Sequence, residues 1–140
     1  MRVLAIDYGS RNIGLAVSDE LGISVRPLPT IRRKRESRRQ LIEQITSHAA
    51  ELEVGCIVIG LPLGGDGEAG EAAVRVEKFA VELEQVSGIR VVRQNERLTS
   101  REAEEMMLEL GLDTKQRKAR SDEFAATIIL REYLDENSRK

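Results

Sequence analysis

The stretch that decides how the chain begins to fold is Arg2-Val-Leu-Ala-Ile-Asp-Tyr-Gly-Ser-Arg-Asn-Ile-Gly-Leu-Ala-Val-Ser18. Residues 2–8 form an apolar run that is typical of a buried strand. Residues 9–12 have the composition of a tight turn, and residues 13–18 resume the apolar pattern as a second strand. Two strands joined by so short a turn predict a β-hairpin.

A third strand is predicted over residues 23–31, after a turn at residues 19–22. Pro27 and Pro29 interrupt it. Because proline lacks the amide hydrogen that a central strand donates, this strand belongs at the edge of the sheet. The three strands together predict an antiparallel meander.

The pattern then changes to a helical period. Two helices are predicted from their apolar faces: Leu41, Ile45, Ala49 and Leu52 in the first, and Ala72, Val76, Phe79, Ala80 and Leu83 in the second. Residues 56–61, between these helices, are apolar throughout, as in a strand that is buried on both faces. Residues 89–94 predict a fifth strand.

Two more helices are predicted near the C-terminus. The first begins at a capping-box pattern, Thr99 with Glu102, and ends at Gly111. Its apolar face contains Ala103, Met106, Met107 and Leu110. A basic loop then leads to a last helix from about Ser121. Its inner face contains Ala125, Ala126, Ile129, Leu130 and Tyr133.

The predicted element order is β-β-β-α-β-α-β-α-α. A hairpin followed by βαβ units indicates an α/β fold in which helices flank a mixed five-stranded sheet. The length of 140 residues fits a single domain over 1–140.

Composition excludes several classes of protein. The only cysteine is Cys56, which rules out an intramolecular disulfide and a zinc cluster built from cysteines. No long apolar span or secretory signal is found, so we expect a cytoplasmic protein with no membrane contact. Aromatic residues make up 3% of the chain, too few for a platform that stacks single-stranded bases.

The positive charge is concentrated in two places, although the formal net charge is −2. The two clusters hold 10 of the 22 Lys and Arg residues: Arg32, Arg33, Lys34, Arg35, Arg38 and Arg39 in one, and Lys115, Arg117, Lys118 and Arg120 in the other. A polyanion would therefore meet local basic patches on an otherwise acidic protein. Basic runs are often only solvated, but the Lys115–Arg120 loop precedes an acidic site candidate and is the better candidate for binding substrate.

Three acidic residues are the candidates for catalysis. Asp7 lies at the end of the first strand, Glu96 follows the fifth, and Asp122 begins the last helix on the face of Ala126 and Ile129. Carboxylates that approach one end of a sheet from three elements can hold one or two hard cations such as Mg²⁺ or Mn²⁺. Two such ions can activate water and stabilise the leaving oxygen in phosphodiester hydrolysis.

Each of these residues also has a simpler interpretation. Asp7 is a common turn former, Glu96 has Arg97 beside it for an ion pair, and Asp122 could stabilise a helix N-terminus. Only the combination of the three on separate elements favours a catalytic site. The loop Gly64-Gly65-Asp66-Gly67 lacks the Gly-Lys-Ser/Thr ending of a P-loop, and is as consistent with a plain turn as with a contact to phosphate.

The ordered set of motifs resembles the YqgF/RuvX family over nearly the whole chain. The matching segments are Ala5-Ile-Asp-Tyr-Gly-Ser-Arg-Asn-Ile-Gly-Leu-Ala16, Arg26-Pro-Leu-Pro-Thr-Ile31, Ile59-Gly-Leu-Pro-Leu63 with Asp66-Gly67, Glu96-Arg-Leu-Thr-Ser100 and Ser121-Asp-Glu-Phe-Ala-Ala-Thr-Ile-Ile-Leu130. The resemblance implies an RNase H-like fold, a relation to Holliday-junction resolvases and a role in maturing the 5′ end of pre-16S ribosomal RNA.

The resemblance also implies roles for residues. It assigns Asp7, Glu96 and Asp122 to the catalytic and metal-binding site. We add as nucleic-acid-binding candidates two arginines within the matching motifs and four residues of the second basic cluster: Arg11, Arg97, Lys115, Arg117, Lys118 and Arg120. The chain departs from the family at Asn95, where an aspartate is usual. Since neighbouring strand residues face opposite ways, we expect Glu96 rather than position 95 to carry the role.

Several functions remain open at this point. The first is a metal-dependent nuclease on structured RNA, acting on pre-rRNA or on ribosomal assembly intermediates. The second is an endonuclease on branched DNA, which would act as a homodimer rather than a monomer. The third is a non-catalytic assembly or nucleic-acid-binding factor. A fourth, less favoured, is an actin-like ATPase or a sugar kinase, because residues 7–10 resemble the phosphate loop of those proteins. Those proteins close two such lobes around ATP, and one domain of 140 residues supplies only one lobe.

Overall fold

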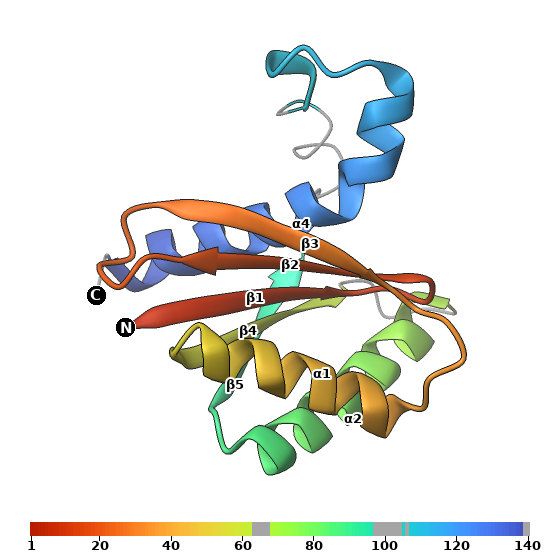
Figure 1. Ribbon diagram of the computed structural model, residues 1–140, viewed down its shortest axis with the longest axis vertical. Helices are drawn as coiled ribbons and strands as arrows, with labels where there is room; N and C mark the ends of the chain where they lie inside the picture. The colour runs from red at the N-terminus through yellow and green to blue at the C-terminus, as the bar shows by residue number, and fades with distance from the viewer. Residues whose placement is uncertain (63–67, 97–104, 106, 139–140) are drawn as a thin grey trace.

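The computed structural model describes residues 1–62, 68–96, 105 and 107–138 (Figure 1). The predicted hairpin is confirmed. Strand β1 (Arg2–Tyr8) pairs antiparallel with β2 (Asn12–Ser18) from Leu4↔Val17 to Tyr8↔Ile13. The turn between them closes with the Gly9 amide donating to the Asn12 carbonyl at 3.0 Å. A Cβ at Gly9 would lie 2.5 Å from that oxygen, so the turn requires glycine.

The strands form one mixed sheet in the order β3-β2-β1-β4-β5. Strand β3 (Val25–Arg32) is antiparallel to β2 and lies at the edge, as its two prolines predict. Strands β4 (Val54–Pro62) and β5 (Val91–Glu96) run parallel to β1. The predicted mixed five-stranded sheet is therefore confirmed, with β1 at its centre, but β5 begins and ends two residues later than predicted.

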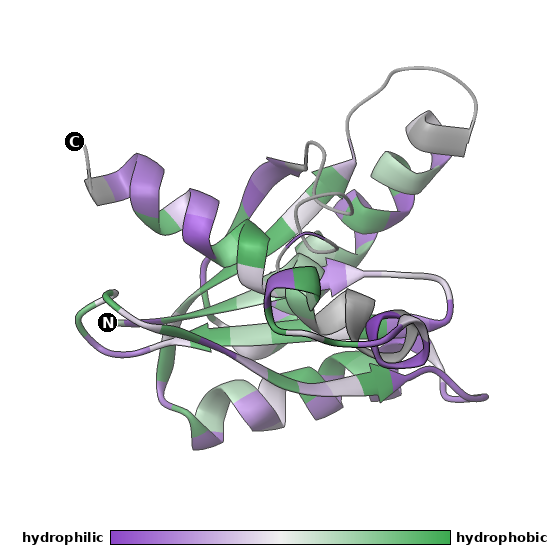
Figure 2. Ribbon diagram, turned by 90° about the horizontal axis from the view of Figure 1, so that it is seen from above, coloured by the Kyte–Doolittle hydropathy of each residue, from purple (hydrophilic) through white to green (hydrophobic). Residues whose placement is uncertain are grey.

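Two helices cover one face of the sheet (Figure 1). Helix α1 (Arg38–Glu51) begins at a capping box, in which Ser37 and Gln40 exchange side-chain-to-backbone hydrogen bonds. Helix α2 is Glu68–Ser87. Their apolar faces form the larger core with the strands, as predicted for Leu41, Ile45, Ala49, Val76, Phe79, Ala80 and Leu83. Figure 2 shows the apolar strands inside and hydrophilic residues on the outer sides of the helices.

Helix α4 (Thr114–Ser138) covers the opposite face of the sheet. The second core lies between this helix and the strands, and includes Val3, Ala5, Cys56, Val58, Ala126, Ile129 and Leu130. Only the C-terminal part of α4 lies along the sheet, while its first turns stand clear of it (Figure 1).

The prediction that the last helix begins near Ser121 after a basic loop is wrong. The helix begins at Thr114, and its first turns contain the basic residues. The reason is a reciprocal cap: the Gln116 amide donates to the Asp113 carboxylate at 2.8 Å, and the Asp113 amide donates to the Gln116 side-chain oxygen at 2.9 Å. Lys and Arg also favour helix formation. A cluster of them on an exposed helix shows no apolar face, however, and therefore resembles a loop in the sequence.

Helical residues also precede α4, over 107–109. Gly111 ends them as predicted, with a φ of 76° and backbone bonds from Gly111 to Leu108 and from Leu112 to Met107. The predicted capping box of Thr99 with Glu102, together with Ala103 and Met106, lies outside the described residues.

Candidate active site

Asp7 lies within β1, two residues before the Gly9 turn, and is half-buried. Residues alternate along the strand: Val3 and Ala5 pack in the core beneath α4, whereas Leu4 and Ile6 pack toward α1 and α2. Asp7 continues the first series and so belongs to the α4 face. Its position in a paired strand, opposite Gly14, does not support the simple turn-former interpretation.

Glu96 is the last residue of β5, opposite Pro62 of β4. Val92 packs against the α4-side core, and the Gln94 amide donates to Glu136 of α4 at 3.1 Å. Arg93 instead forms an ion pair with Glu77 of α2, at 2.6 Å. Position 96 therefore continues the α4-facing register, and exposed Asn95 continues the register of Arg93. The side chain of Glu96 lies outside the described part of the chain.

Asp122 does not begin the last helix, which corrects the sequence prediction. It lies in the third turn of α4, because that helix begins at Thr114. The interpretation of Asp122 as a stabiliser of the helix N-terminus therefore fails, since that effect is confined to the first turn. Its backbone position precedes fully buried Ala126 by one turn and Ile129 by two. The side chain of Asp122 also lies outside the described part of the chain.

The two strands that carry Asp7 and Glu96 end at the same edge of the sheet. Ile59 of β4 pairs with Ile6 on one side and with Arg93 on the other, so Asp7 is level with Gln94. Two strand spacings across and two residues along give a Cα separation of about 12 Å between Asp7 and Glu96. Helix α4 packs across β1 and β2 on this face.

Carboxylate oxygens are the ligands that Mg²⁺ and Mn²⁺ prefer, so the donor set of these three positions fits a hard divalent cation. Among the side chains that the structure describes, no group of three His, Cys, Asp or Glu residues could hold a metal ion. Since Glu96 and Asp122 are outside that set, this observation tests only sites elsewhere.

The predicted nucleic-acid-binding residues lie in two places. Arg11 is exposed in the β1–β2 turn, at the same edge as Asp7. Lys115 is exposed on the first turn of α4, whereas half-buried Arg117 donates to the Leu112 carbonyl at 2.8 Å and to the Thr114 hydroxyl at 3.3 Å. Arg117 therefore braces the segment before α4. Arg97 and the side chains of Lys118 and Arg120 lie outside the description.

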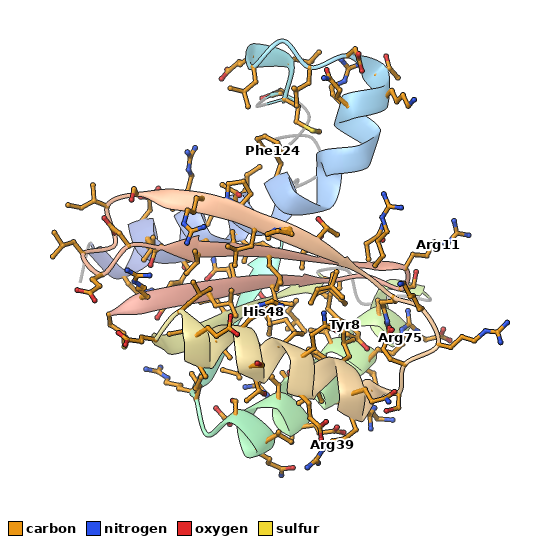
Figure 3. All side chains as sticks on the ribbon, in the orientation of Figure 1. Tyr8, Arg11, Arg39, His48, Arg75 and Phe124 are labelled. Carbon is orange, nitrogen blue, oxygen red and sulfur yellow. The ribbon has the colours of Figure 1, made fainter. Side chains whose placement is uncertain are left out.

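Arg75 was not predicted from sequence. It lies in the middle of α2, yet the fold brings it to the turn that carries Arg11 (Figure 3). A single arginine on the exposed side of a helix carries no signal, because only the packing of α2 on the sheet decides which loop it meets.

No helix among the described residues is both long and apolar enough to cross a membrane.

Comparison with known proteins identifies relatives along the full chain. The chain is 41% identical to a Syntrophus aciditrophicus protein, over 100% of this chain and 92% of that protein. It is also 41% identical to a Halalkalibacterium halodurans protein, over 100% of both. Both relatives carry the name "Putative pre-16S rRNA nuclease".

Solved structures with a similar fold include Holliday-junction resolvases. RuvC of T. thermophilus in complex with a Holliday junction substrate has a TM-score of 0.58 at 15% identity, covering 99% of this chain and 96% of that one. The fowlpox virus Holliday junction resolvase has a TM-score of 0.61 at 13% identity, covering 97% and 99%. At these identities the likeness confirms the RNase H-like fold alone. The family model described as "RuvX: Holliday junction resolvase" matches residues 1–136, and the chain belongs to that family.

Proposed function

We propose that this protein is a divalent-metal-dependent nuclease that hydrolyses phosphodiester bonds of structured RNA, at the 5′ end of pre-16S ribosomal RNA. The observation that carries the proposal is the register of β1 and β5, which assigns positions 7 and 96 to the α4 face at one edge of the sheet. The names of the full-length relatives support the choice of substrate.

In this proposal Asp7, Glu96 and Asp122 hold the metal. One or two Mg²⁺ or Mn²⁺ ions, when bound there, supply an activated water and stabilise the leaving oxygen. With a Cα separation of about 12 Å, an Asp and a Glu side chain could reach toward a common site between them, where a metal would be held. The backbone of Asp7 is held rigidly, because β1 is hydrogen-bonded to a strand on each side. The polyanionic RNA strand would be attracted by basic residues of the predicted binding set, namely Arg97, Lys115, Lys118 and Arg120.

The exchange of the family's usual aspartate for Asn95 does not argue against catalysis. The register of β5 assigns Asn95 to the side of α1 and α2 and Glu96 to the side of Asp7. This arrangement favours an active enzyme over the third possibility, a non-catalytic assembly factor. Pre-ribosomal particles in the cytoplasm are the partners that this function implies.

A second candidate is an endonuclease on branched DNA. The similarity in fold to RuvC and to the fowlpox virus resolvase supports it. A resolvase must present two active sites to one junction, so this candidate requires a homodimer.

The proposed function is tested by comparing the wild-type protein with Asp7→Asn. The substrates are a pre-16S 5′-leader RNA and a four-way DNA junction, each with Mg²⁺, Mn²⁺ or EDTA. We expect metal-dependent cleavage of the RNA, lost by at least about 100-fold in the variant, which is the low end of the loss when one group that stabilises the transition state is removed. Glu43→Gln, an exposed carboxylate on α1, is the matched control and should cleave normally.

The outcomes separate the candidates. Cleavage of the junction in preference to the RNA would select the resolvase. Equal turnover by Asp7→Asn and wild type would refute the metal site, and RNA binding without cleavage of either substrate would select the assembly factor.

A further inference from the structure

A basic pocket lies at the carboxyl edge of the sheet, on the face opposite to that of Asp7. Its volume is about 410 Å³. Three segments line it: the β1–β2 turn from Tyr8 to Arg11, the residues Arg33, Lys34 and Glu36 after β3, and the side of α2 around Arg75. Figure 3 shows Tyr8, Arg11 and Arg75 at the same end of the molecule.

The charge of this pocket favours an anion. Four cationic side chains line it, Arg11, Arg33, Lys34 and Arg75, against one carboxylate, Glu36. That carboxylate also accepts a hydrogen bond from the Lys34 backbone amide at 2.9 Å. None of the four cations forms an ion pair with a carboxylate in the described part of the chain. Four cations against one carboxylate leave a local excess of positive charge at the pocket, which attracts an anion.

One of the four cations is held in place before any ligand arrives. The Arg33 guanidinium donates to the Gly9 carbonyl at 3.1 Å and lies 5.1 Å from the centre of the Tyr8 ring. Tyr8 in turn stacks on Phe79, which is fully buried, with 4.2 Å between ring centres. The Arg33 amide also donates to the Arg11 carbonyl at 2.8 Å. A half-buried, braced guanidinium loses little freedom on binding phosphate, which it suits by geometry.

We infer that this pocket binds a backbone phosphate of the nucleic-acid substrate, apart from the phosphate that is cleaved. The identity of the ligand as nucleic acid rests on the proposed function. Asp7 and Tyr8 are neighbours in β1 that belong to opposite faces, so the pocket and the metal-site candidate flank one rim of the sheet. A strand that crosses this rim contacts both.

The chemistry of the pocket favours phosphate over base recognition. One aromatic ring, Tyr8, lines it, and that ring already contacts Arg33 and Phe79. Binding should therefore be independent of base sequence and sensitive to salt.

The test measures binding without cleavage. Asp7→Asn protein in EDTA is titrated against a short fluorescein-labelled RNA from the pre-16S leader, with anisotropy read at several salt concentrations. In that background we expect Arg11→Gln and Arg75→Gln each to weaken binding by about threefold to tenfold and to lower the salt slope by about one. Arg90→Gln removes the same charge from an exposed site immediately before β5 and should change neither quantity.

Two further arms identify the ligand. Inorganic phosphate and ATP are added as competitors, and only high concentrations should displace the RNA. Unchanged RNA affinity and salt slope in both variants would overturn the inference. A second result would also overturn it: low concentrations of phosphate or ATP displace the RNA from the parent protein, and this competition disappears in Arg75→Gln. The pocket would then be a site for small anions.

Failure of the inference and failure of the proposed function give different results. If Asp7→Asn abolishes cleavage but both arginine variants bind RNA as the parent does, the function stands and the pocket does not. If the arginine variants bind weakly but wild type cleaves nothing, the pocket stands and the nuclease does not.

Discussion

At the scale of single residues, alternation along two strands carries the functional argument. Asp7 follows Val3 and Ala5 under α4, and Asn95 follows Arg93 toward α2. The sequence pattern pointed to the candidate acids because each stands next to the end of an element predicted from sequence. It could not show that Asp122 lies inside a helix, because the cap that starts α4 is formed by Asp113, among charged residues typical of a loop.

The register makes a prediction about Asn95. Asn95→Asp should leave metal-dependent cleavage within about twofold of wild type, because a carboxylate there stands on the other side of the strand from Asp7. Glu96→Gln should abolish cleavage. Both are measured as single-turnover rates on the RNA leader. A gain of about tenfold or more in Asn95→Asp would mean that position 95 reaches the metal, and the assignment of faces would be wrong.

At the scale of elements, the start of α4 is set by local hydrogen bonds. Asp113→Ala removes the acceptor for the Gln116 amide and should lower the free energy of unfolding by about 1 kcal/mol. Urea denaturation monitored by circular dichroism measures the change. Lys115→Ala, an exposed residue of the same turn with no part in the cap, is the control. Equal stability of the two variants would show that the cap does not hold the helix.

The turn between β2 and β3 also depends on a carboxylate. The Ile23 amide donates to Asp19 at 2.8 Å, and this bond, with weaker ones from Ser24 and Gly22, lowers the pKa of Asp19 below its usual 3.8. A depressed folded-state pKa contributes stability that is present above pH 3.8 and is lost as pH falls through the folded value.

Asp19→Ala should therefore be less stable than wild type at neutral pH, and the difference should shrink at pH values below the folded-state pKa. Thermal unfolding of both proteins across this range measures it. A difference independent of pH would mean that the side chain acts through packing or backbone conformation rather than through its charge.

At the scale of the whole molecule, the sheet and most of its covering helices follow from sequence periodicity. Edge placement of β3 followed from two prolines, and burial of β4 from its unbroken apolar run. What could not be predicted was the meeting of distant segments. Arg11, Arg33 and Arg75 come from three separate parts of the chain, and only the packing of α2 against the sheet brings them to one pocket.

The central position of β1 has a consequence for where a substrate would be cut. The last two residues of this strand belong to opposite faces, and the covalent chain fixes their spacing, with β2 and β4 holding the strand on both sides. The phosphate-binding pocket beside Tyr8 and the metal site proposed beside Asp7 would therefore lie at a fixed distance from each other. If both sites act as proposed, the number of nucleotides between the bound phosphate and the cleaved bond should be constant, whatever the base sequence between them.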